Sequence, residues 1–301
     1  MAPGRLAALL DGPATVTARP VVLDVRWRLG GPPGRADHEA GHLPGAVFVD
    51  LDTELAAPPG EGGRHPLPAP AALQDVLRRA GVSRGSRVVA YDDDSGAVAA
   101  RAWWLLRWAG LPADRVAVLD GGFRAWVAEC LPVTAAQTRP APGDLVVHPG
   151  GMPVVDADGA AELARHGVLL DARAGARYRG ETEPVDARAG HVPGARNAPA
   201  TEHLDADGRW LPPDALAARY AALGVTAPEG GAAEPAADAR PEPDGAGVGA
   251  YCGSGVNATA VVLALEYAGL RSPTRPAALY AGSWSQWSAD PRRPVATGRE
   301  T

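Results

Sequence analysis

The sequence predicts an α/β protein built from two tandem domains, each a mostly parallel sheet flanked by helices on both faces. Its 301 residues leave room for two domains of about 100–200 residues each. Four sequence blocks recur in the same order about half a chain later, which indicates two copies of one domain. Within each copy, strand-like and helix-like segments alternate, and this alternation favours a parallel sheet covered on both faces.

The repeated blocks set the domain organisation. They are VVLDVRWR (21–28) and VLLDARAG (168–175), GHLPGA (41–46) and GHVPGA (190–195), VVAYDDDSG and GVGAYCGSG (ending at Gly96 and Gly255), and VLDGGFRAW (118–126) and LYAGSWSQW (279–287). We therefore place a first domain at 1–140 and a second at 150–301, joined by the Pro/Gly-rich stretch Thr138–Met152. Ala227–Ala246 has no apolar period and no counterpart in the first copy, which predicts a disordered surface insertion.

Apolar spacing predicts the elements of each copy. Short apolar runs bounded by turn residues indicate buried strands, whereas apolar residues three or four apart indicate helices. The first copy is expected to contain, in order, the strand Val21–Val25, a helix near Ala71–Ala80, the strand Ser86–Tyr91, the helix Ala97–Ala109 and the strand Val116–Leu119. The second is expected to contain the strand Val168–Asp171, the helix Ala215–Leu223, the strand Gly247–Tyr251, the helix Ala258–Gly269 and the strand Ala277–Tyr280.

Composition excludes several classes of function. The charge balance of 29 Lys+Arg against 35 Asp+Glu argues against a nucleic-acid binder, which needs a basic surface. No stretch approaches about 18 uninterrupted apolar residues, so no membrane span is expected. Two cysteines make no disulfide framework and no zinc-finger spacing, so neither a metal nor a cofactor is expected. The N-terminal residues lack the features of a signal peptide, and we expect a cytoplasmic protein.

Cys252 is the strongest candidate for a catalytic residue. It follows a predicted strand of a parallel sheet, at the edge where such sheets bind ligands. Gly253 and Gly255 allow the backbone to curl and to point N–H groups inward, and the start of the next helix adds partial positive charge. This setting favours the thiolate, so we expect a lowered pKa and a nucleophilic sulfur. The alternative is that Cys252 is simply a small residue of the core.

The repeat provides an internal comparison. Asp92 stands in the first copy where Cys252 stands in the second, and an aspartate cannot relay a thiol reaction. We therefore predict that only the second domain is catalytic and that the first is a structural half that closes the site. Cys130 follows AWVAE without a glycine loop, and we expect it to have no chemical role.

The CGSGVN loop, LYAGSWSQW and the two GH[LV]PGA motifs resemble the tandem-domain sulfurtransferases of the rhodanese superfamily, over about residues 20–290. The resemblance implies that Cys252 accepts a sulfur atom as a persulfide. The sulfur would then pass to an acceptor, which could be a thiol such as thioredoxin, or cyanide. The sequence does not identify which of these acceptors is used.

The loop also bears on the sulfur donor. Thiosulfate-using members usually place basic residues directly after the cysteine, whereas Gly253-Ser254 looks like the loop of the 3-mercaptopyruvate sulfurtransferases. A neutral loop suits a donor whose charge is a remote carboxylate, so we predict a preference for mercaptopyruvate. Such a donor leaves an enolate that must be protonated. The resemblance implies that Ser254, His65 and Asp52 carry out this step.

Donor binding calls for arginine, whose guanidinium fork grips two oxygens. The resemblance implies that Arg177 holds the donor's carboxylate. Val185 fills the place of a second arginine found in many mercaptopyruvate members, and Arg188 is the nearest substitute.

The loop residues Gly253, Gly255, Val256 and Asn257 are expected to contact the donor. Three positions depart from the family pattern. Asn257 replaces a threonine and is expected to cap the following helix in its place. Ala281 replaces an aspartate and Gln286 a glutamate, and we expect both to loosen the wall beside the loop.

Parts of the sequence also bear on three other functions. A thiosulfate:cyanide sulfurtransferase is the principal alternative, and a non-catalytic binding module is a weaker one because Cys252 is retained. A cysteine phosphatase or arsenate reductase requires Cys-x5-Arg. That class is disfavoured because the residue at the arginine position is Ala258.

Overall fold

The computed structural model describes residues 1–12, 19–227 and 247–299, and the chain divides into two compact units. The first consists of Met1–Pro58, Leu67–Gly151 and Leu204–Trp210, and the second of Pro59–Pro66, Met152–His203 and Leu211–Thr301. The units therefore differ from the predicted domains in two short segments. Pro59–Pro66, from the first half of the chain, packs with the second unit, and Leu204–Trp210 packs with the first.

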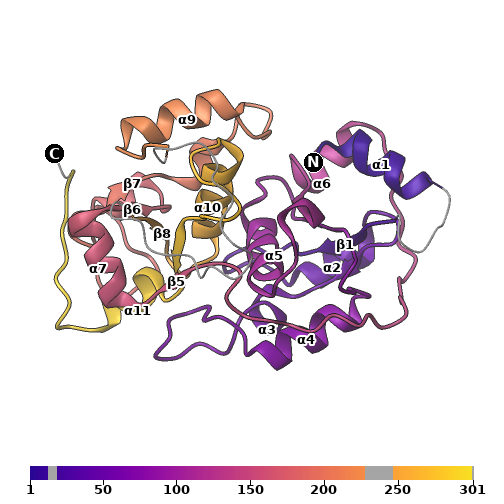
Figure 1. The fold of residues 1–301 in the computed structure, drawn as a ribbon, viewed down its shortest axis with the longest axis horizontal. Coiled ribbons are helices and arrows are strands. Elements are labelled where there is room, and N and C mark those ends of the chain that lie inside the picture. Colours follow the sequence, from indigo (N-terminus) through magenta and orange to yellow (C-terminus); the bar gives the residue numbers. More distant parts are fainter. Residues whose placement is uncertain (13–18, 228–246, 300–301) are drawn as a thin grey trace. The chain divides into compact units, whose positions relative to one another are not determined.

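The first unit is built on a four-stranded, fully parallel sheet with the order β2-β1-β3-β4 (Figure 1). Its strands are β1 (Val21–Asp24), β2 (Val47–Phe48), β3 (Val88–Tyr91) and β4 (Val116–Val118). Its helices are α1 (Pro3–Asp11), α2 (Gly34–Ala40), α3 (Leu51–Glu54), α4 (Pro70–Arg79), α5 (Ala97–Trp108), the short 3-10 helix η1 (Ala113–Arg115) and α6 (Gly122–Ala128). Almost every residue of α5 is buried, as expected for a helix that is apolar on all sides.

The second unit contains a five-stranded parallel sheet with the order β5-β9-β8-β6-β7. Its strands are β5 (Val154–Val155), β6 (Val168–Asp171), β7 (Arg196–Asn197), β8 (Val248–Tyr251) and β9 (Ala278–Tyr280). Its helices are α7 (Ala157–His166), α8 (Gly175–Tyr178), the 3-10 helix η2 (Ala200–His203), α9 (Pro213–Ala222), α10 (Asn257–Tyr267) and α11 (Ser283–Ala289).

The predicted repeat is visible in the strand register. Asp24 at the end of β1 lies opposite Tyr91 at the end of β3, and Asp171 at the end of β6 lies opposite Tyr251 at the end of β8. Asp92 follows Tyr91 and Cys252 follows Tyr251, and each begins the loop that leads from its strand into the next helix. The sequence thus predicted the α/β fold and the two copies of one domain correctly.

A buried ion pair lies at the end of an interior strand of each sheet, β1 in the first unit and β6 in the second. Arg26 binds Asp24 at 2.7 Å, and Arg173 binds Asp171 at 2.6 Å. Each arginine also donates to the carbonyl of the first glycine of its GH[LV]PGA motif, Gly41 or Gly190, at 2.7 Å. In each unit, the same arginine therefore pairs with the aspartate at the strand end and hydrogen-bonds to the repeated motif.

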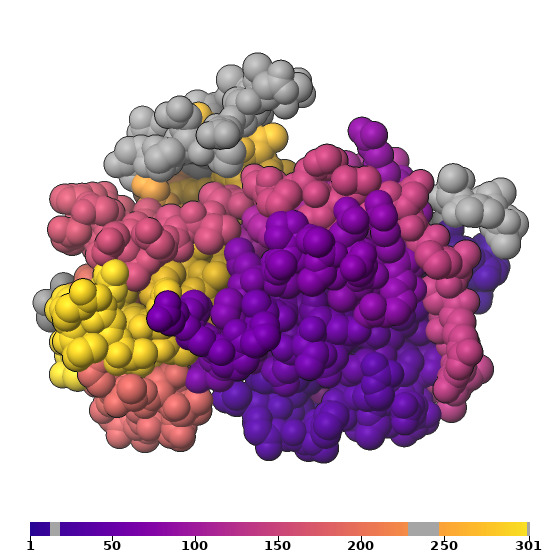
Figure 2. Space-filling view, turned by 90° about the horizontal axis from the view of Figure 1, so that it is seen from below, coloured from indigo at the N-terminus to yellow at the C-terminus, as the bar shows by residue number. Residues whose placement is uncertain are grey.

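The segment that follows each copy returns to the same motif. His42 exchanges backbone hydrogen bonds with Thr134, and His191 does so with Ala296. The latter belongs to the C-terminal segment, which lies at the surface of the second unit and is yellow in Figure 2.

Periodicity found the long elements and missed the short ones. All the predicted strands and helices are present within a few residues of the expected bounds. The helices α1, α2 and α7 were not predicted, although α7 has the same length as α4 and α9. Of the predicted insertion Ala227–Ala246, all but the first residue lie outside the described part. None of the helices in residues 1–12, 19–227 and 247–299 has the length and apolarity that crossing a membrane requires.

Candidate active site

Cys252 directly follows β8 and begins the loop that leads into α10. Its side chain is buried, and its Sγ accepts a hydrogen bond from the Gly255 N–H at 3.1 Å. Gly255 has a φ of +79°, and a Cβ built on it would lie 2.6 Å from the Ala281 carbonyl oxygen. Only glycine therefore fits where the backbone turns its N–H toward the sulfur.

The start of α11 forms one wall of this loop. The N–H of Trp284 donates to the Cys252 carbonyl, and the N–H of Ser285 donates to the Gly253 carbonyl, both at 2.9 Å. The Cys252 N–H in turn donates to Ser283 Oγ at 3.1 Å. Three hydrogen bonds thus hold the backbone on both sides of the sulfur, which fixes Cys252 relative to α11.

The segment Pro59–Pro66 brings His65 to the same loop. His65 Nδ1 lies 2.8 Å from Ser254 Oγ, and both side chains are buried. The Arg64 N–H donates to Ser285 Oγ at 3.0 Å, which ties the segment to α11. Gly63 has a φ of +99°, and a Cβ there would lie 2.6 Å from the Gly282 carbonyl oxygen, so this contact also requires glycine. The predicted pairing of His65 with Ser254 is therefore present in the structure.

Gln286 strengthens the wall that it was expected to loosen. Its Nε2 donates to the Glu61 carbonyl at 2.8 Å, and its Oε1 accepts from the Tyr280 hydroxyl at 2.9 Å. A glutamate could accept from Tyr280 but could not donate to Glu61. The expectation for Gln286 is therefore wrong, because the amide uses both its donor and its acceptor.

The expectation for Asn257 is also wrong. Asn257 is the first residue of α10, its side chain is exposed, and α10 has no side-chain cap. Val256, which occupies the cap position, is buried beside the loop.

Two arginines flank Gly253. A Cβ built on this glycine would lie 3.5 Å from Arg177 Nη1 and 3.1 Å from Arg64 Nη2. Arg177 was predicted, whereas Arg64 was missed, although it precedes His65 in GRHPLP. The premise that the loop is neutral, with only a remote cation, is therefore wrong, because two guanidinium groups lie beside the residue next to Cys252.

Arg188 occupies a different environment from the one expected of a donor-binding residue. Its guanidinium donates to four backbone carbonyls at 2.6–3.0 Å. The acceptors are the carbonyls of Trp287, Ser288, Asp290 and Arg293. These bonds join the end of α11 to the chain that follows it, and we leave Arg188 out of the proposed donor site.

A chain of alternating charges connects the end of β6 to the loop that begins at Cys252. Arg173 pairs with Asp171 and, at 3.4 Å, with Glu183. Arg177 pairs with Glu183 at 2.6 Å and with Asp186 at 2.8 Å, and Asp186 pairs with Arg64 at 2.7 Å. Three carboxylates and three guanidinium groups thus alternate from the sheet to Gly253.

Burial and pairing act in opposite directions on the groups of this chain. Burial is the largest single influence on Glu183 and would raise its pKa, but the hydrogen bonds from Arg177 and from the backbone N–H groups of Asp186 and Val185, with the charge of Arg177, together hold that pKa below its usual value. Burial is the largest single influence on Arg173 and would lower its pKa, but the charge and hydrogen bonds of Asp171, together with the charges of Tyr251 and Glu183, give a net rise. Both groups are therefore charged at neutral pH.

Asp52 belongs to the first unit, on α3. Its carboxylate accepts a hydrogen bond from Trp27 Nε1 at 2.8 Å. Its action on His65 stays a prediction.

In the first unit, the equivalent loop holds a carboxylate in place of a thiol. Asp92 is buried and accepts from the N–H groups of Gly96, Val98 and Ala99 at 2.9–3.1 Å. Burial outweighs these bonds and raises the pKa of Asp92 to about 6. The N–H groups at the start of α5 are thus already satisfied by the chain itself.

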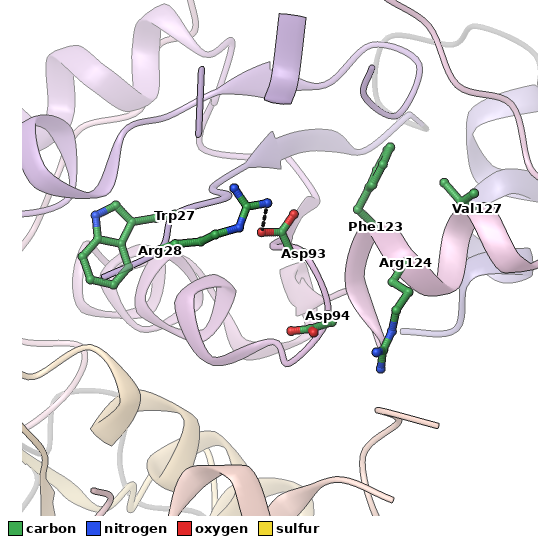
Figure 3. Close-up of a pocket in the computed structure, with 7 residues that line it drawn as sticks. All are labelled: Trp27, Arg28, Asp93, Asp94, Phe123, Arg124 and Val127. Atoms are coloured by element: carbon green, nitrogen blue, oxygen red, sulfur yellow. Dashed lines mark ion pairs between the residues drawn. The ribbon is translucent and has the colours of Figure 1, made fainter. Parts of the chain in front are cut away.

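A pocket of about 660 Å³ lies beside this loop (Figure 3). Arg28 and Asp93 line the pocket and form an ion pair, with 2.8 Å between the guanidinium nitrogen and the carboxylate oxygen. Asp94, Phe123 and Arg124 also line it. The residues that line it include no cysteine, and the inactivity of this copy stays a prediction. Cys130 is exposed at the end of α6. Across the described part of the chain, no three His, Cys, Asp or Glu side chains gather as a metal site would require.

Comparison with known proteins agrees with this geometry. The family model of the rhodanese-like domain matches residues 2–129 and again 156–290. The chain belongs to the rhodanese family. Its two rhodanese-like domains place it among the tandem-domain members, as the internal repeat predicted.

The relatives carry sulfurtransferase names. A Pseudomonas aeruginosa protein named a probable 3-mercaptopyruvate sulfurtransferase is 46% identical over 98% of this chain and 96% of its own. A Mycobacterium tuberculosis protein provisionally named thiosulfate sulfurtransferase SseB is 43% identical over 92% of this chain and 90% of its own. The crystal structure of SseA from Escherichia coli, titled as a 3-mercaptopyruvate sulfotransferase, superposes with a TM-score of 0.73, at 27% identity, over 95% of this chain and 98% of that one.

Replacing Gln286 with glutamate tests how the rhodanese-like second domain holds His65. Gln286→Glu should speed hydrogen exchange at the amides of Gly63 and Arg64 by about tenfold, because losing one hydrogen bond weakens the attachment of their segment. Gln137→Glu, an exposed change of the same kind in the first unit, should leave those amides unaffected. Equal exchange in wild type and Gln286→Glu would show that this bond does not hold the segment.

Proposed function

We propose that the protein is a sulfurtransferase that moves sulfur from 3-mercaptopyruvate, through a persulfide on Cys252, to a thiol such as thioredoxin or to cyanide. The observation that carries the proposal is the contact between two buried side chains, in which His65 Nδ1 lies 2.8 Å from Ser254 Oγ. Ser254 is two residues along the loop from Cys252. A nucleophile beside a proton-transfer pair is what this donor requires.

In the loading step, the Cys252 thiolate attacks the sulfur of mercaptopyruvate. An S–S bond forms while the donor's carbon–sulfur bond breaks, and the bonding electrons remain on carbon as the enolate of pyruvate. The donor's thiol proton is transferred to that carbon through Ser254 and His65, so pyruvate leaves and Cys252 carries a persulfide. Asp52 is assigned the role of orienting His65.

In the unloading step, the acceptor attacks the outer sulfur of the persulfide and Cys252 leaves as a thiolate. The Gly255 N–H, 3.1 Å from Sγ, stabilises the negative charge that returns to this atom. Both cysteines are free in the structure. A free catalytic thiol fits a reducing compartment, and we propose the cytoplasm.

Thiosulfate is the second candidate donor. Its sulfonate carries negative charge next to the transferred sulfur, and Arg64 and Arg177 both lie beside Gly253. The name of the M. tuberculosis relative points to the same donor. The neutral-loop argument for mercaptopyruvate thus no longer holds. We keep mercaptopyruvate as the preferred donor because of the His65–Ser254 pair.

The first test concerns the sulfur carrier. Incubation with either donor should add about one sulfur atom, +32 in intact mass, to wild type and to Cys130→Ser but not to Cys252→Ser, because only Cys252 lies in the loop. An adduct that survives in Cys252→Ser and is lost in Cys130→Ser would reverse the assignment.

The second test concerns proton transfer. His65→Ala should lower kcat with mercaptopyruvate by about 10²–10⁴-fold, the usual contribution of a proton-transfer group. Loading from thiosulfate, which needs no protonation of carbon, should fall less. His166→Ala, at an exposed position on α7, serves as the control. Equal losses with both donors would mean that His65 acts only by supporting the loop.

A further inference from the structure

We infer that Arg64 is a donor-binding residue, forming with Arg177 a two-guanidinium clamp for the oxyanion group of the sulfur donor. The inference rests on the proposed function for the identity of the donor. It names a residue from the first half of the chain that is carried to the catalytic loop of the second unit by the segment Pro59–Pro66.

The positions of the two guanidinium groups are the first argument. A Cβ on Gly253 would meet Arg64 Nη2 at 3.1 Å and Arg177 Nη1 at 3.5 Å. Gly253 is bonded to Cys252, so both groups lie beside the residue that follows the nucleophile. Any side chain at position 253 would enter the space between them and the loop.

The unused donors are the second argument. Arg64 donates a hydrogen bond from Nη1 to Asp186, and within the described residues its Nη2 donates to no acceptor. Its Nε is buried and also lacks a partner there. Arg177 donates from Nε to Glu183 and from Nη2 to both Glu183 and Asp186. Within the same part of the chain, its Nη1 makes no hydrogen bond. Each arginine therefore keeps one terminal N–H group for a ligand on the side that faces Gly253.

Asp186 is the positioning residue of this clamp. One carboxylate oxygen accepts from Arg64 at 2.7 Å, and the other accepts from Arg177 at 2.8 Å. The side chain of Asp186 is only 3% exposed, so its own position is fixed. A single buried carboxylate thus holds two guanidinium groups side by side, which their mutual repulsion would otherwise oppose.

The chemistry of the clamp defines its ligand. Guanidinium groups bind planar or tetrahedral oxyanions through paired N–H donors. The α-keto carboxylate of mercaptopyruvate and the sulfonate of thiosulfate both present such oxygens. Uncharged thiols do not. The clamp therefore selects small sulfur donors that carry an oxyanion, and Arg64 supplies the second guanidinium that Val185 cannot.

Binding to an inactive variant tests the clamp separately from catalysis. In the Cys252→Ser background, calorimetry should show that Arg64→Gln weakens the binding of pyruvate and of thiosulfate by at least about tenfold, since a charge-assisted contact is lost. Arg64→Lys, which keeps the charge but not the fork, should recover part of this loss. Arg179→Gln is the matched control, because Arg179 pairs with the exposed Glu181 on the same short segment as Arg177.

Steady-state kinetics provide the second readout. Arg64→Gln should raise KM at least about tenfold with a smaller change in kcat, and Asp186→Asn should raise KM in the same direction while Asp186→Glu restores it in part. Unchanged binding and unchanged KM in Arg64→Gln would overturn the clamp. Wild-type protein that binds both anions but transfers no sulfur would contradict the proposed function and leave the clamp standing.

Discussion

The buried ion pair between Asp171 and Arg173 is the interaction on which the site depends. It lies where β6 ends, is almost inaccessible to solvent, and connects the sheet to the GHVPGA motif through the Gly190 carbonyl. Breaking such a pair by removing one partner costs about 3–5 kcal/mol. From Arg173 the alternating charges continue through Glu183 to the loop, so the core of the unit and the donor site are joined by one electrostatic network.

The two units place different groups in one type of loop. In the first, the Asp92 carboxylate accepts hydrogen bonds from three N–H groups at the start of α5. In the second, the Cys252 sulfur accepts a hydrogen bond from one N–H group, and the guanidinium groups of Arg64 and Arg177 lie beside the neighbouring Gly253. The fold therefore supplies a cradle for negative charge in both units. The identity of a single residue decides whether that charge is structural or chemical.

Local sequence patterns predicted the features that depend on neighbouring residues. Cys252 was identified from a strand, a glycine loop and a helix start that are contiguous in the chain, and the buried strands followed from short apolar runs. Arg64 could not be found in this way, because its position depends on a contact between residues more than 180 positions apart. Arg188 was predicted to bind the donor because of its place in the sequence, but its guanidinium group is hydrogen-bonded to backbone carbonyls distant in the chain. Asn257 was assigned to a cap position that belongs to Val256.

The central claim is that the charge network from Asp171 to Arg64 acts as one unit on the catalytic loop. A double-mutant cycle between Glu183→Gln and Arg64→Gln, measured on the rate of persulfide loading in a single turnover, tests it most directly. Glu183 does not pair with Arg64 but reaches it through Arg177 and Asp186. The account predicts a coupling free energy of about 1 kcal/mol or more between the two sites. Effects that simply add would contradict it.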